Sequence, residues 1–372
     1  MLDPRLVTLA KQLVNYSVAV KPGDKVLITC GDCDPSFVAC LVDEVYLAGG
    51  MPITKYSMSP IGLHVARQAS EDYYKFMFKI NKPLYESIQC SISCGGELNK
   101  FDGKSIPPEI MKTAALINKP FSDIIDKNKV RWVGLDFPNP SVAQEAKMET
   151  EEFEDYFFEV CNFDYAIMDK ALTPLAELML KADRVRVVAP DTDLTFSIKG
   201  QLNRKCVGHF NIPDGEIFTS PIKNSVNGKV KFNVPLNRDG KVFTDIELTF
   251  KNGKVVKHNC SDNKAFEHIL NTDKGSRYVG EFAFGINPHI KEPMVNTLFD
   301  EKISGSWHMA LGKFIPETPN GNESAIHMDM VQIQTPEYGG GEIYFDDKLI
   351  RKDGKFVLKE LKGLNAEILG RQ

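Results

Sequence analysis

Residues 26–56 read VLITCGDCDPSFVACLVDEVYLAGGMPITKY and contain the signals that decide the fold. The apolar segment Val26–Thr29 predicts a strand, and Asp34-Pro35 then supplies a cap and a first residue for a helix. Gly49-Gly50 ends that helix, and residues 52–56 predict the next strand. Because strand–helix–strand units build parallel sheets, we expect the first part of the chain to be an open, mostly parallel sheet flanked by helices.

The pattern of apolar residues changes after Asp183. Before it, helical patterns cover 65–79, 108–127, 142–160 and 165–181. After it, short alternating segments predict strands at 185–188, 194–198, 229–234, 242–250 and 255–258, separated by turn signals such as Asn227-Gly228. The sequence therefore predicts an α/β domain over 1–182 and a β-rich α+β domain over 183–372.

Charge and hydropathy exclude several classes of protein. The 372 residues include 45 Lys and Arg spread along the chain and 50 Asp and Glu, so the formal net charge is -5 and we expect no nucleic-acid partner. No apolar run approaches the ~20 residues of a membrane helix. Residues 1–5 lack the basic start and apolar stretch of a signal peptide. We expect no membrane association, a cytoplasmic location and a small or peptide-like partner.

Eight cysteines raise the question of a disulfide framework or a zinc site. Cys30 and Cys33 lie where a strand turns into a helix, and Cys90 and Cys94 could complete a metal site with them. The gap between the two pairs, however, far exceeds the roughly 12 to 20 residues of a zinc finger or ribbon. We interpret these cysteines as small buried thiols.

Metal-competent side chains recur on strand-like segments of the second half. In residues 325–330, a period of two places His327 and Asp329 on one face and Met328 on the other. In residues 306–312, His308 shares its face with small residues, which leave room around the imidazole. A lone histidine on a strand is more often structural, so the repetition of the pattern carries the interpretation. The other five histidines lack this context: His64, His209, His258, His268 and His289.

Carboxylates complete the set. Glu281 stands on a strand with an apolar opposite face, where an ionised group needs a charge partner. Glu216 follows the turn Pro213–Gly215 and begins a strand, and Glu301 lies upstream of His308. Two imidazoles and four carboxylates exceed the needs of one divalent ion and suit a pair about 3.5 to 4 Å apart.

At these residues the sequence resembles the thermophilic-type metalloaminopeptidases, the aminopeptidase T and aminopeptidase S family. The similarity runs over most of the chain. Its most specific marks are Asn211–Glu216, Val279–Glu281, Asn296–Glu301, His308–Gly312 and Ser324–Asp329.

The resemblance implies an enzyme that releases N-terminal residues from peptides with a metal-activated water. It implies two zinc or cobalt ions, with manganese or magnesium as alternatives, and a homodimer of two-domain chains. The implied ligands are Glu216, Glu281, His308, His327 and Asp329; Glu301 matches a further acidic position, although its spacing to the histidine is longer here. Glu216 and Glu281 are the candidates to carry the proton from water to the leaving amine.

One position departs from the family. Its members carry a tyrosine seven residues after the first ligand histidine, thought to stabilise the transition state, and this chain has Ile315 there. Tyr278, Tyr338 or Tyr344 could substitute from elsewhere in the fold. Otherwise the chain hydrolyses peptides weakly or acts on something else.

Two other functions stay open. His308, His327 and Asp329 by themselves form the two-histidine, one-carboxylate set of mononuclear iron oxygenases, and a pyridine-ring-cleaving dioxygenase is similar to this family. Retention of Glu216 and Glu281 favours two metals over one iron. The second alternative is a metal-stabilised binding protein that lost catalysis together with the tyrosine.

Overall fold

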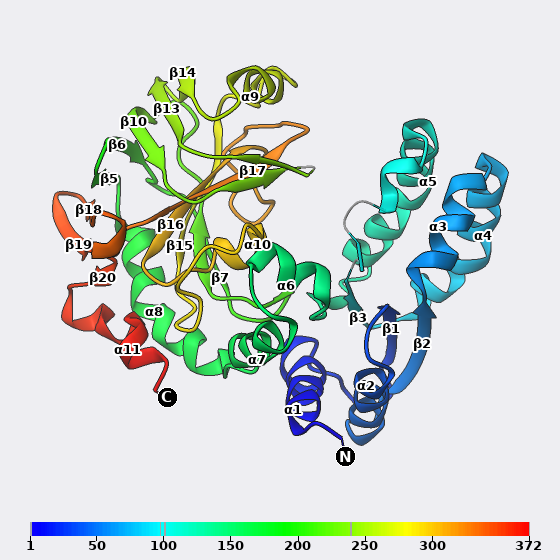
Figure 1. Ribbon diagram of the computed structural model, residues 1–372. Coiled ribbons are helices and arrows are strands. Elements are labelled where there is room, and N and C mark those ends of the chain that lie inside the picture. Colours follow the sequence, from blue (N-terminus) through cyan, green and yellow to red (C-terminus); the bar gives the residue numbers. More distant parts are fainter. Residues whose placement is uncertain (1, 97, 100–101, 239, 372) are drawn as a thin grey trace. The chain divides into compact units, whose positions relative to one another are not determined.

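The computed structural model describes residues 2–96, 98–99, 102–238 and 240–371. Contacts divide the chain into two compact units: Met1–Asn162 with Gly208–Ile212, and Phe163–Val207 with Pro213–Gln372 (Figure 1). This division falls earlier than the predicted boundary at 182/183, because helix α8 (Tyr165–Lys181) belongs to the second unit. The predicted fold class is confirmed: a parallel sheet flanked by helices, followed by β-rich antiparallel sheets.

The first unit is built on a parallel sheet in the order β2-β1-β3-β4-β8. Its strands are β1 (Lys25–Gly31), β2 (Met51–Ser57), β3 (Cys90–Gly95), β4 (Arg131–Asp136) and β8 (Asn211–Ile212). Between the first two lies α2 (Pro35–Leu47), and the Asp34 carboxylate accepts a hydrogen bond from the Ser36 N–H at its start. The βαβ unit predicted from residues 26–56 is therefore present.

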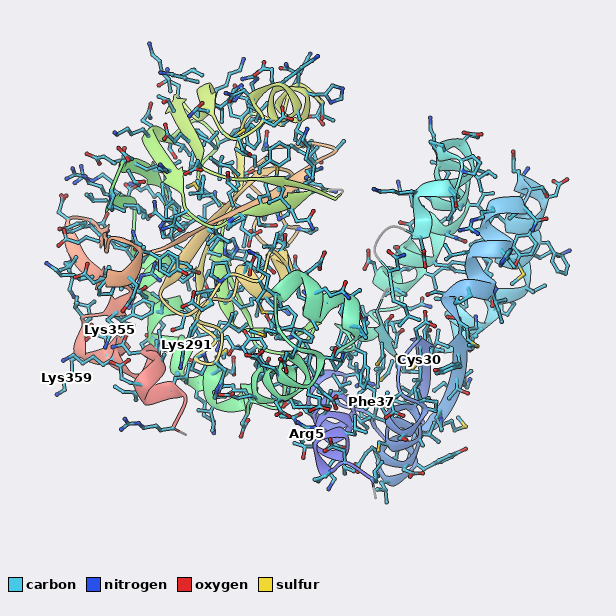
Figure 2. All side chains as sticks on the ribbon, viewed as in Figure 1. Arg5, Cys30, Phe37, Lys291, Lys355 and Lys359 are labelled. Carbon is cyan, nitrogen blue, oxygen red and sulfur yellow. The ribbon has the colours of Figure 1, made fainter. Side chains whose placement is uncertain are left out.

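The other helices of the first unit connect and flank these strands. They are α1 (Pro4–Gln12), the π-helical turn η1 (Leu13–Ser17), α3 (Ser59–Gln68), α4 (Glu71–Ser87), the 3-10 turn η2 (Asp102–Ser105), α5 (Pro108–Lys127), α6 (Pro140–Ala146) and α7 (Thr150–Cys161). Cys30 and Phe37 are both buried in this unit (Figure 2). Cys33 is buried with Cys94, and its thiol lies 3.2 Å from the Cys94 carbonyl oxygen, so these cysteines are free thiols in the core.

Two large antiparallel sheets form most of the second unit, beside a two-stranded sheet. The larger has the order β14-β13-β10-β6-β5-β18-β19-β20. Its strands are β5 (Arg184–Ala189), β6 (Thr192–Ser197), β10 (Asn227–Phe232), β13 (Ile246–Lys251), β14 (Lys254–Asn259), β18 (Glu342–Phe345), β19 (Lys348–Lys352) and β20 (Lys355–Phe356). The smaller, with the order β17-β16-β15-β9-β7, consists of β7 (Asn203–Cys206), β9 (Glu216–Thr219), β15 (Val279–Gly285), β16 (Ser306–Gly312) and β17 (His327–Ile333).

The remaining elements of this unit are short, apart from α8. They are the hairpin β11 (Leu236–Arg238) and β12 (Lys241–Phe243), α9 (Asn263–Leu270), α10 (Thr297–Asp300), α11 (Ala366–Leu369), and the 3-10 turns η3 (Pro336–Tyr338) and η4 (Lys359–Leu364). Among the described residues, none of the helices combines the length and the apolar character that crossing a membrane requires.

Aromatic side chains fill the space between the two sheets of the second unit. Phe282 of β15 packs edge-on against Phe196 of β6, with ring centroids 4.9 Å apart. Trp307 of β16 packs against Phe232 of β10 at 5.8 Å and is fully buried. Because side chains alternate along a strand, committing one face of β15 and β16 to this core leaves the opposite face available for polar groups. That opposite face carries Glu281 and His308.

Candidate metal centre

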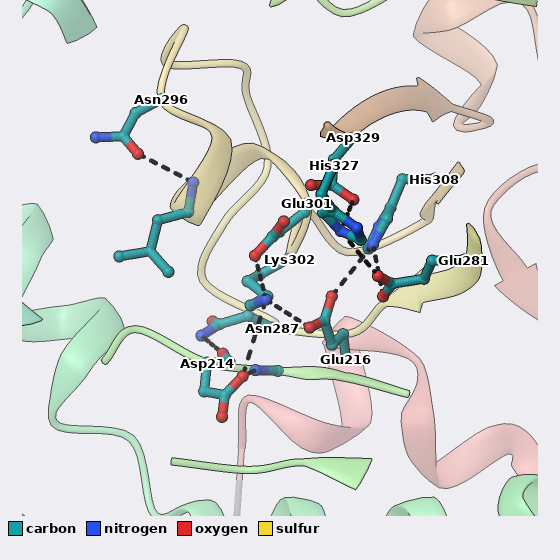
Figure 3. A network of polar contacts seen from close by, with 12 residues as sticks. Asp214, Glu216, Glu281, Asn287, Asn296, Glu301, Lys302, His308, His327 and Asp329 are labelled. Carbon is teal, nitrogen blue, oxygen red and sulfur yellow. Dashed lines mark hydrogen bonds and ion pairs between the residues drawn. The ribbon is translucent and has the colours of Figure 1, made fainter. Parts of the chain in front are cut away.

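The smaller sheet and the end of helix α10 bring all six predicted site residues together in the second unit (Figure 3). Glu216 begins β9, Glu281 lies on β15, and His308 lies on β16. His327 and Asp329 lie on β17, and Glu301 is the C-cap residue of α10. Their donor atoms form three overlapping groups, each with atoms within 4.8 Å of one another: Glu216, Glu281 and His308; Glu281, His327 and Asp329; Glu301, His308 and Asp329.

Strand register places small residues beside the large polar ones. Asp329 pairs with Ala310, and His327 pairs with Gly312. The pairing of β15 with β16 shifts between Val279 and Glu281, where Gly280 approaches the next strand so closely that a Cβ there would lie 2.4 Å from the Lys313 carbonyl oxygen. Such a bulge redirects a side chain. Here it sets the direction of Glu281.

Glu216 is positioned by the turn that precedes it. Gly215 has a φ of +130°, and a Cβ at this residue would lie 2.9 Å from the Asn287 Cβ, so both conformation and space require glycine. The Asn287 amide donates a hydrogen bond of 2.8 Å to the Asp214 carbonyl oxygen and holds the turn. The turn signal seen in the sequence therefore has a structural purpose, which is to deliver Glu216 at the first position of β9.

The imidazoles and carboxylates of the cluster lie within ion-pair distance of one another. His327 Nε2 lies 3.2 Å from Glu281 Oε2 and 3.3 Å from Asp329 Oδ1. His308 Nε2 lies 3.4 Å from Glu216 Oε2 and 3.7 Å from Glu281 Oε1. The side chains of Glu281 and His308 are 3% and 1% exposed, whereas that of His327 is 33% exposed. The cluster thus reaches solvent on the His327 side.

The electrostatics of the cluster demand positive charge. Burial lowers the pKa of His308, but the carboxylates of Glu281 and Glu216 outweigh burial and raise it to about 9. Burial also opposes the charged form of His327, yet Asp329 and Glu281 raise its pKa to about 12. In turn, His308 and His327 hold the pKa of Glu281 below its usual value against the effect of burial. The carboxylates therefore stabilise any cation placed among them.

The ring of His327 is oriented by a backbone carbonyl. Its Nδ1 lies 2.8 Å from the Lys313 oxygen, and because a carbonyl only accepts, Nδ1 carries the proton. Nε2 faces Glu281 and Asp329, and its lone pair would be available to a metal ion that takes the place of the Nε2 proton. This is the second hydrogen bond that metal-binding histidines make to fix their tautomer and direction.

A carboxylate also holds the loop that leads into β17. Asp273 accepts hydrogen bonds from the Ala325 N–H at 2.6 Å and from the Ser324 hydroxyl at 2.9 Å. It also accepts from the N–H groups of Gly275 and Ser276. The bond from Ala325 is the main cause that lowers the pKa of Asp273 to about 2. The backbone two residues before His327 is therefore anchored.

The donor set fits divalent metal ions. Carboxylate oxygens and imidazole nitrogens suit zinc, cobalt and manganese. Within the described ranges, both ring nitrogens of His308 and the Oε2 atom of Glu216 are buried without a hydrogen-bond partner. Buried polar atoms rarely lack a partner, and coordination to a metal would satisfy them.

The sequence interpretation missed Lys302. It directly follows Glu301, its side chain is 1% exposed, and its ammonium lies 2.7 Å from Glu216 Oε1 and 2.5 Å from Glu301 Oε1. Burial raises the pKa of Glu301 to about 8, with Lys302 acting in the opposite direction. No pattern around residue 302 distinguishes it from a surface lysine, because its position depends on the loop after α10 rather than on a strand period.

Each of the three candidate tyrosines contacts a partner outside the cluster. The Tyr338 hydroxyl donates to Glu292 at 2.6 Å, and the Tyr344 hydroxyl donates to Glu342 on β18 of the larger sheet. The ring of Tyr278 lies 4.9 Å from the Lys223 ammonium. Ile315 is partly buried in the loop after β16, where its carbonyl accepts from the Thr318 N–H at 2.9 Å. The position that the resemblance assigns to a phenol is thus on the loop that leaves the His308 strand.

The chain thus has a parallel α/β unit and an antiparallel β-rich unit. The second unit contains a buried cluster of carboxylates and imidazoles, which is the kind of donor set that metalloenzymes use. The chain belongs to the thermophilic metalloprotease family (M29), whose model matches residues 2–356. It is therefore a metallopeptidase by family, an enzyme of the hydrolase class.

Three proteins illustrate the similarity. Aminopeptidase T of Thermus thermophilus is 32% identical over 378 residues, which cover 87% of this chain and 91% of that protein. The structure of wild-type AmpT from Thermus thermophilus matches with a TM-score of 0.81 at 20% identity, covering 95% and 99% of the two chains. The 2,5-dihydroxypyridine dioxygenase of Pseudomonas putida KT2440 has a TM-score of 0.61 at 14% identity, covering 96% and 98%. The two structural likenesses show a shared fold.

Proposed function

We propose that this chain is a metal-dependent aminopeptidase that binds two divalent ions and releases N-terminal residues from peptides. Zinc or cobalt suits the nitrogen and oxygen donors, with manganese or magnesium as alternatives. The observation that carries the proposal is the position of Glu281 between two histidines. One of its oxygens faces His308 and the other faces His327, as a carboxylate that bridges two ions requires.

The proposed ligands are Glu216, Glu281, Glu301, His308, His327 and Asp329. Glu281, His308 and Asp329 each belong to two of the three donor groups, so the groups describe neighbouring positions rather than separate sites. This overlap supports a pair of ions about 3.5 to 4 Å apart.

Bound divalent ions would supply a water of lowered pKa and a Lewis acid for the scissile carbonyl. Glu216 and Glu281 are the proposed catalytic residues: the one of them that is not fully used in coordination would take the proton of that water and pass it to the leaving amine. The surplus of buried carboxylates also favours a substrate with a positively charged α-amine, and hence peptides with a free N-terminus.

The shared fold does not favour the iron-dioxygenase alternative over a peptidase, because solved structures of both kinds of enzyme are similar to this chain. His308, His327 and Asp329 are present, but Glu216 and Glu281 lie among them as well. Family membership and this carboxylate surplus together favour hydrolysis over oxygen chemistry.

We also propose a homodimer, as the sequence resemblance implies, acting in the cytoplasm, where buried thiols such as Cys30 stay reduced. The helices α3, α4 and α5 carry no fully buried side chain. They expose the apolar residues Ile61, Val65, Tyr73, Phe76, Ile80, Met111 and Leu116, a feature typical of association surfaces. Light scattering on the purified chain measures the oligomeric state directly.

Metal content and turnover of an aminoacyl-arylamide test the enzymatic proposal together. We expect two ions per chain after reconstitution, and cleavage that N-acetylation of the substrate abolishes. His327→Ala and Asp329→Ala should each lose metal and activity, whereas the core swap Met328→Leu should keep both. Saturation at one ion, equal cleavage of the acetylated substrate, or the reverse pattern among the three variants would contradict the proposal.

A further inference from the structure

Lys302 places a fixed positive charge inside the carboxylate cluster (Figure 3). Besides Glu216 and Glu301, its ammonium approaches Asp214 Oδ1 at 4.0 Å, and Asp214 is only 2% exposed. A buried lysine is rare unless it is paired, and this one faces three acidic side chains.

Two of these acidic residues, Asp214 and Glu216, also belong to a fourth group of possible metal donors, on the Lys302 side of the cluster. Cys206, Asp214 and Glu216 have donor atoms within 4.8 Å of one another. Cys206 of β7 pairs directly with Glu216 of β9, which brings the thiol to that carboxylate. This group shares only Glu216 with the three groups that contain histidines. A thiolate with two carboxylates would suit zinc, cobalt or cadmium.

Glu216 divides its two oxygens between the two sides. Oε1 lies 2.7 Å from the Lys302 ammonium, and Oε2 faces His308 at 3.4 Å. A carboxylate held in this way at one oxygen presents the other in a fixed direction. Lys302 is therefore a positioning residue for Glu216 as well as a charge partner.

We propose that the Lys302 ammonium takes the place of a third cation, so that the cluster binds two ions on the histidine side and none at Cys206, Asp214 and Glu216. The proposal rests on the two-ion aminopeptidase described above. An ammonium donates hydrogen bonds and satisfies buried carboxylates, but it coordinates no metal and repels one. The number of ions is thus set by a side chain rather than by the supply of carboxylates.

The test is to remove the charge and count ions. Lys302→Met removes the ammonium and keeps the apolar stem, and Lys302→Met with Cys206→Ser is the matched control. Each protein is reconstituted with Co²⁺, freed of excess ion and measured for cobalt per chain and for thiolate-to-cobalt absorption in the near ultraviolet. We expect two ions and no thiolate band in the unaltered chain, a gain of one ion with a thiolate band in Lys302→Met, and loss of both gains in the control.

The outcomes separate the two proposals. An ion count in the unaltered chain that differs from two contradicts the dinuclear function, whereas the difference between Lys302→Met and the unaltered chain judges the role of Lys302. No extra ion and no thiolate band in Lys302→Met, or a thiolate band already present in the unaltered chain, overturns the inference. Because a divalent ion should replace the ammonium, Co²⁺ should also restore folding to a variant that misfolds without it. If Lys302→Met and Lys302→Gln both stay unfolded with Co²⁺, the inference is wrong.

Discussion

Ile315 is a residue at which this chain departs from the chemistry that the sequence resemblance implies. It lies on the loop after β16, seven residues beyond His308, and offers no hydrogen-bond donor from its side chain. Tyr338 and Tyr344 direct their hydroxyls to Glu292 and Glu342. The developing oxyanion would therefore depend on the metal ions without help from a phenol at this position.

Ile315→Tyr should raise the rate of peptide hydrolysis. Loss of one oxyanion donor costs about 2.7 to 4 kcal/mol in a transition state, so its return should raise kcat by roughly a hundredfold to a thousandfold. Metal content should stay the same, because no ligand changes. Steady-state kinetics on an aminoacyl-arylamide measure the effect.

Ile315→Phe is the matched control, since it adds the ring without the hydroxyl. An equal gain in both variants would assign the effect to packing rather than to a donor. If the unaltered chain is already fast and Ile315→Tyr changes nothing, another group supplies the donor, and Tyr278→Phe becomes the next variant to measure.

The site residues differ in how far the sequence could predict them. His327 and Asp329 follow a strand period of two between apolar neighbours, so their shared face is visible in the sequence. In the structure, His327 Nε2 lies 3.3 Å from Asp329 Oδ1. Lys302 follows no such period. Its burial results from long-range packing of the loop after α10 against β9, and local pattern carries no signal for that.

At the scale of elements, the loop before β17 is held by a charged anchor. Asp273 receives the Ala325 N–H and the Ser324 hydroxyl, just before the strand that presents His327. The position of that strand's first residue thus depends on a carboxylate remote in sequence. Its charge is maintained because these hydrogen bonds lower the pKa of Asp273 to about 2 from 3.8.

Asp273→Asn should reduce both stability and metal retention. The expected loss in the free energy of unfolding is roughly 1 kcal/mol at neutral pH, since the carboxylate is partly exposed. A carboxyl with a lowered folded-state pKa contributes stability above its unfolded pKa and loses it as the pH falls through the folded one. The difference between the two proteins should therefore be full at pH 5 and shrink between about pH 4 and 2. Urea unfolding across this range measures it.

Ser324→Ala is the comparison variant for this loop. It removes one donor and leaves the charge, so it should lower stability with little dependence on pH in the same window. A difference between Asp273→Asn and the unaltered chain that stays constant from pH 5 to 2 would show that the charge has no part in anchoring the loop.

Element boundaries show what periodicity misses. The expected helices over 108–127 and 165–181 are present as α5 and α8, because a single apolar period runs through each. The expected helix over 142–160 is instead α6 and α7, since Lys147 adopts a φ of +58° and ends the first. The expected helix over 65–79 is divided at Ser70, whose hydroxyl caps α4. Ser70 with its following acidic residues is a cap signal that outweighs the apolar period.

At the scale of the whole molecule, helix α8 accounts for the difference between the division by contacts and the predicted boundary at 182/183, which follows the change in sequence pattern. Its sequence is helical like the elements before it, but it belongs to the second unit. Tyr165 accepts a hydrogen bond of 2.9 Å from the Asp214 N–H, and the helix buries an apolar face: Tyr165, Met168, Leu172, Leu175 and Met179.

A fragment of residues 1–182 should therefore self-associate more strongly than a fragment of residues 1–162. The longer one exposes the apolar face of α8 without its partners, and such surfaces promote association. We expect the longer fragment to bind a hydrophobic dye more strongly and to self-associate, as measured by fluorescence and light scattering. Equal dye binding and equal size for both fragments would support the boundary at 182/183 instead.

Strand β8 completes the sheet of the first unit late during synthesis of the chain. Asn211 and Ile212 pair in parallel with Gly134 and Leu135 of β4 and occupy one edge of the sheet. The ribosome makes them only after it has made residues 163–207, which belong to the other unit. At about 5 to 20 residues per second, the nascent sheet waits roughly 4 to 15 seconds with the β4 edge uncovered. An open edge can pair with another chain. The β4 edge is therefore open to other chains while this chain is still on the ribosome, before Glu216 at the start of β9 has been added.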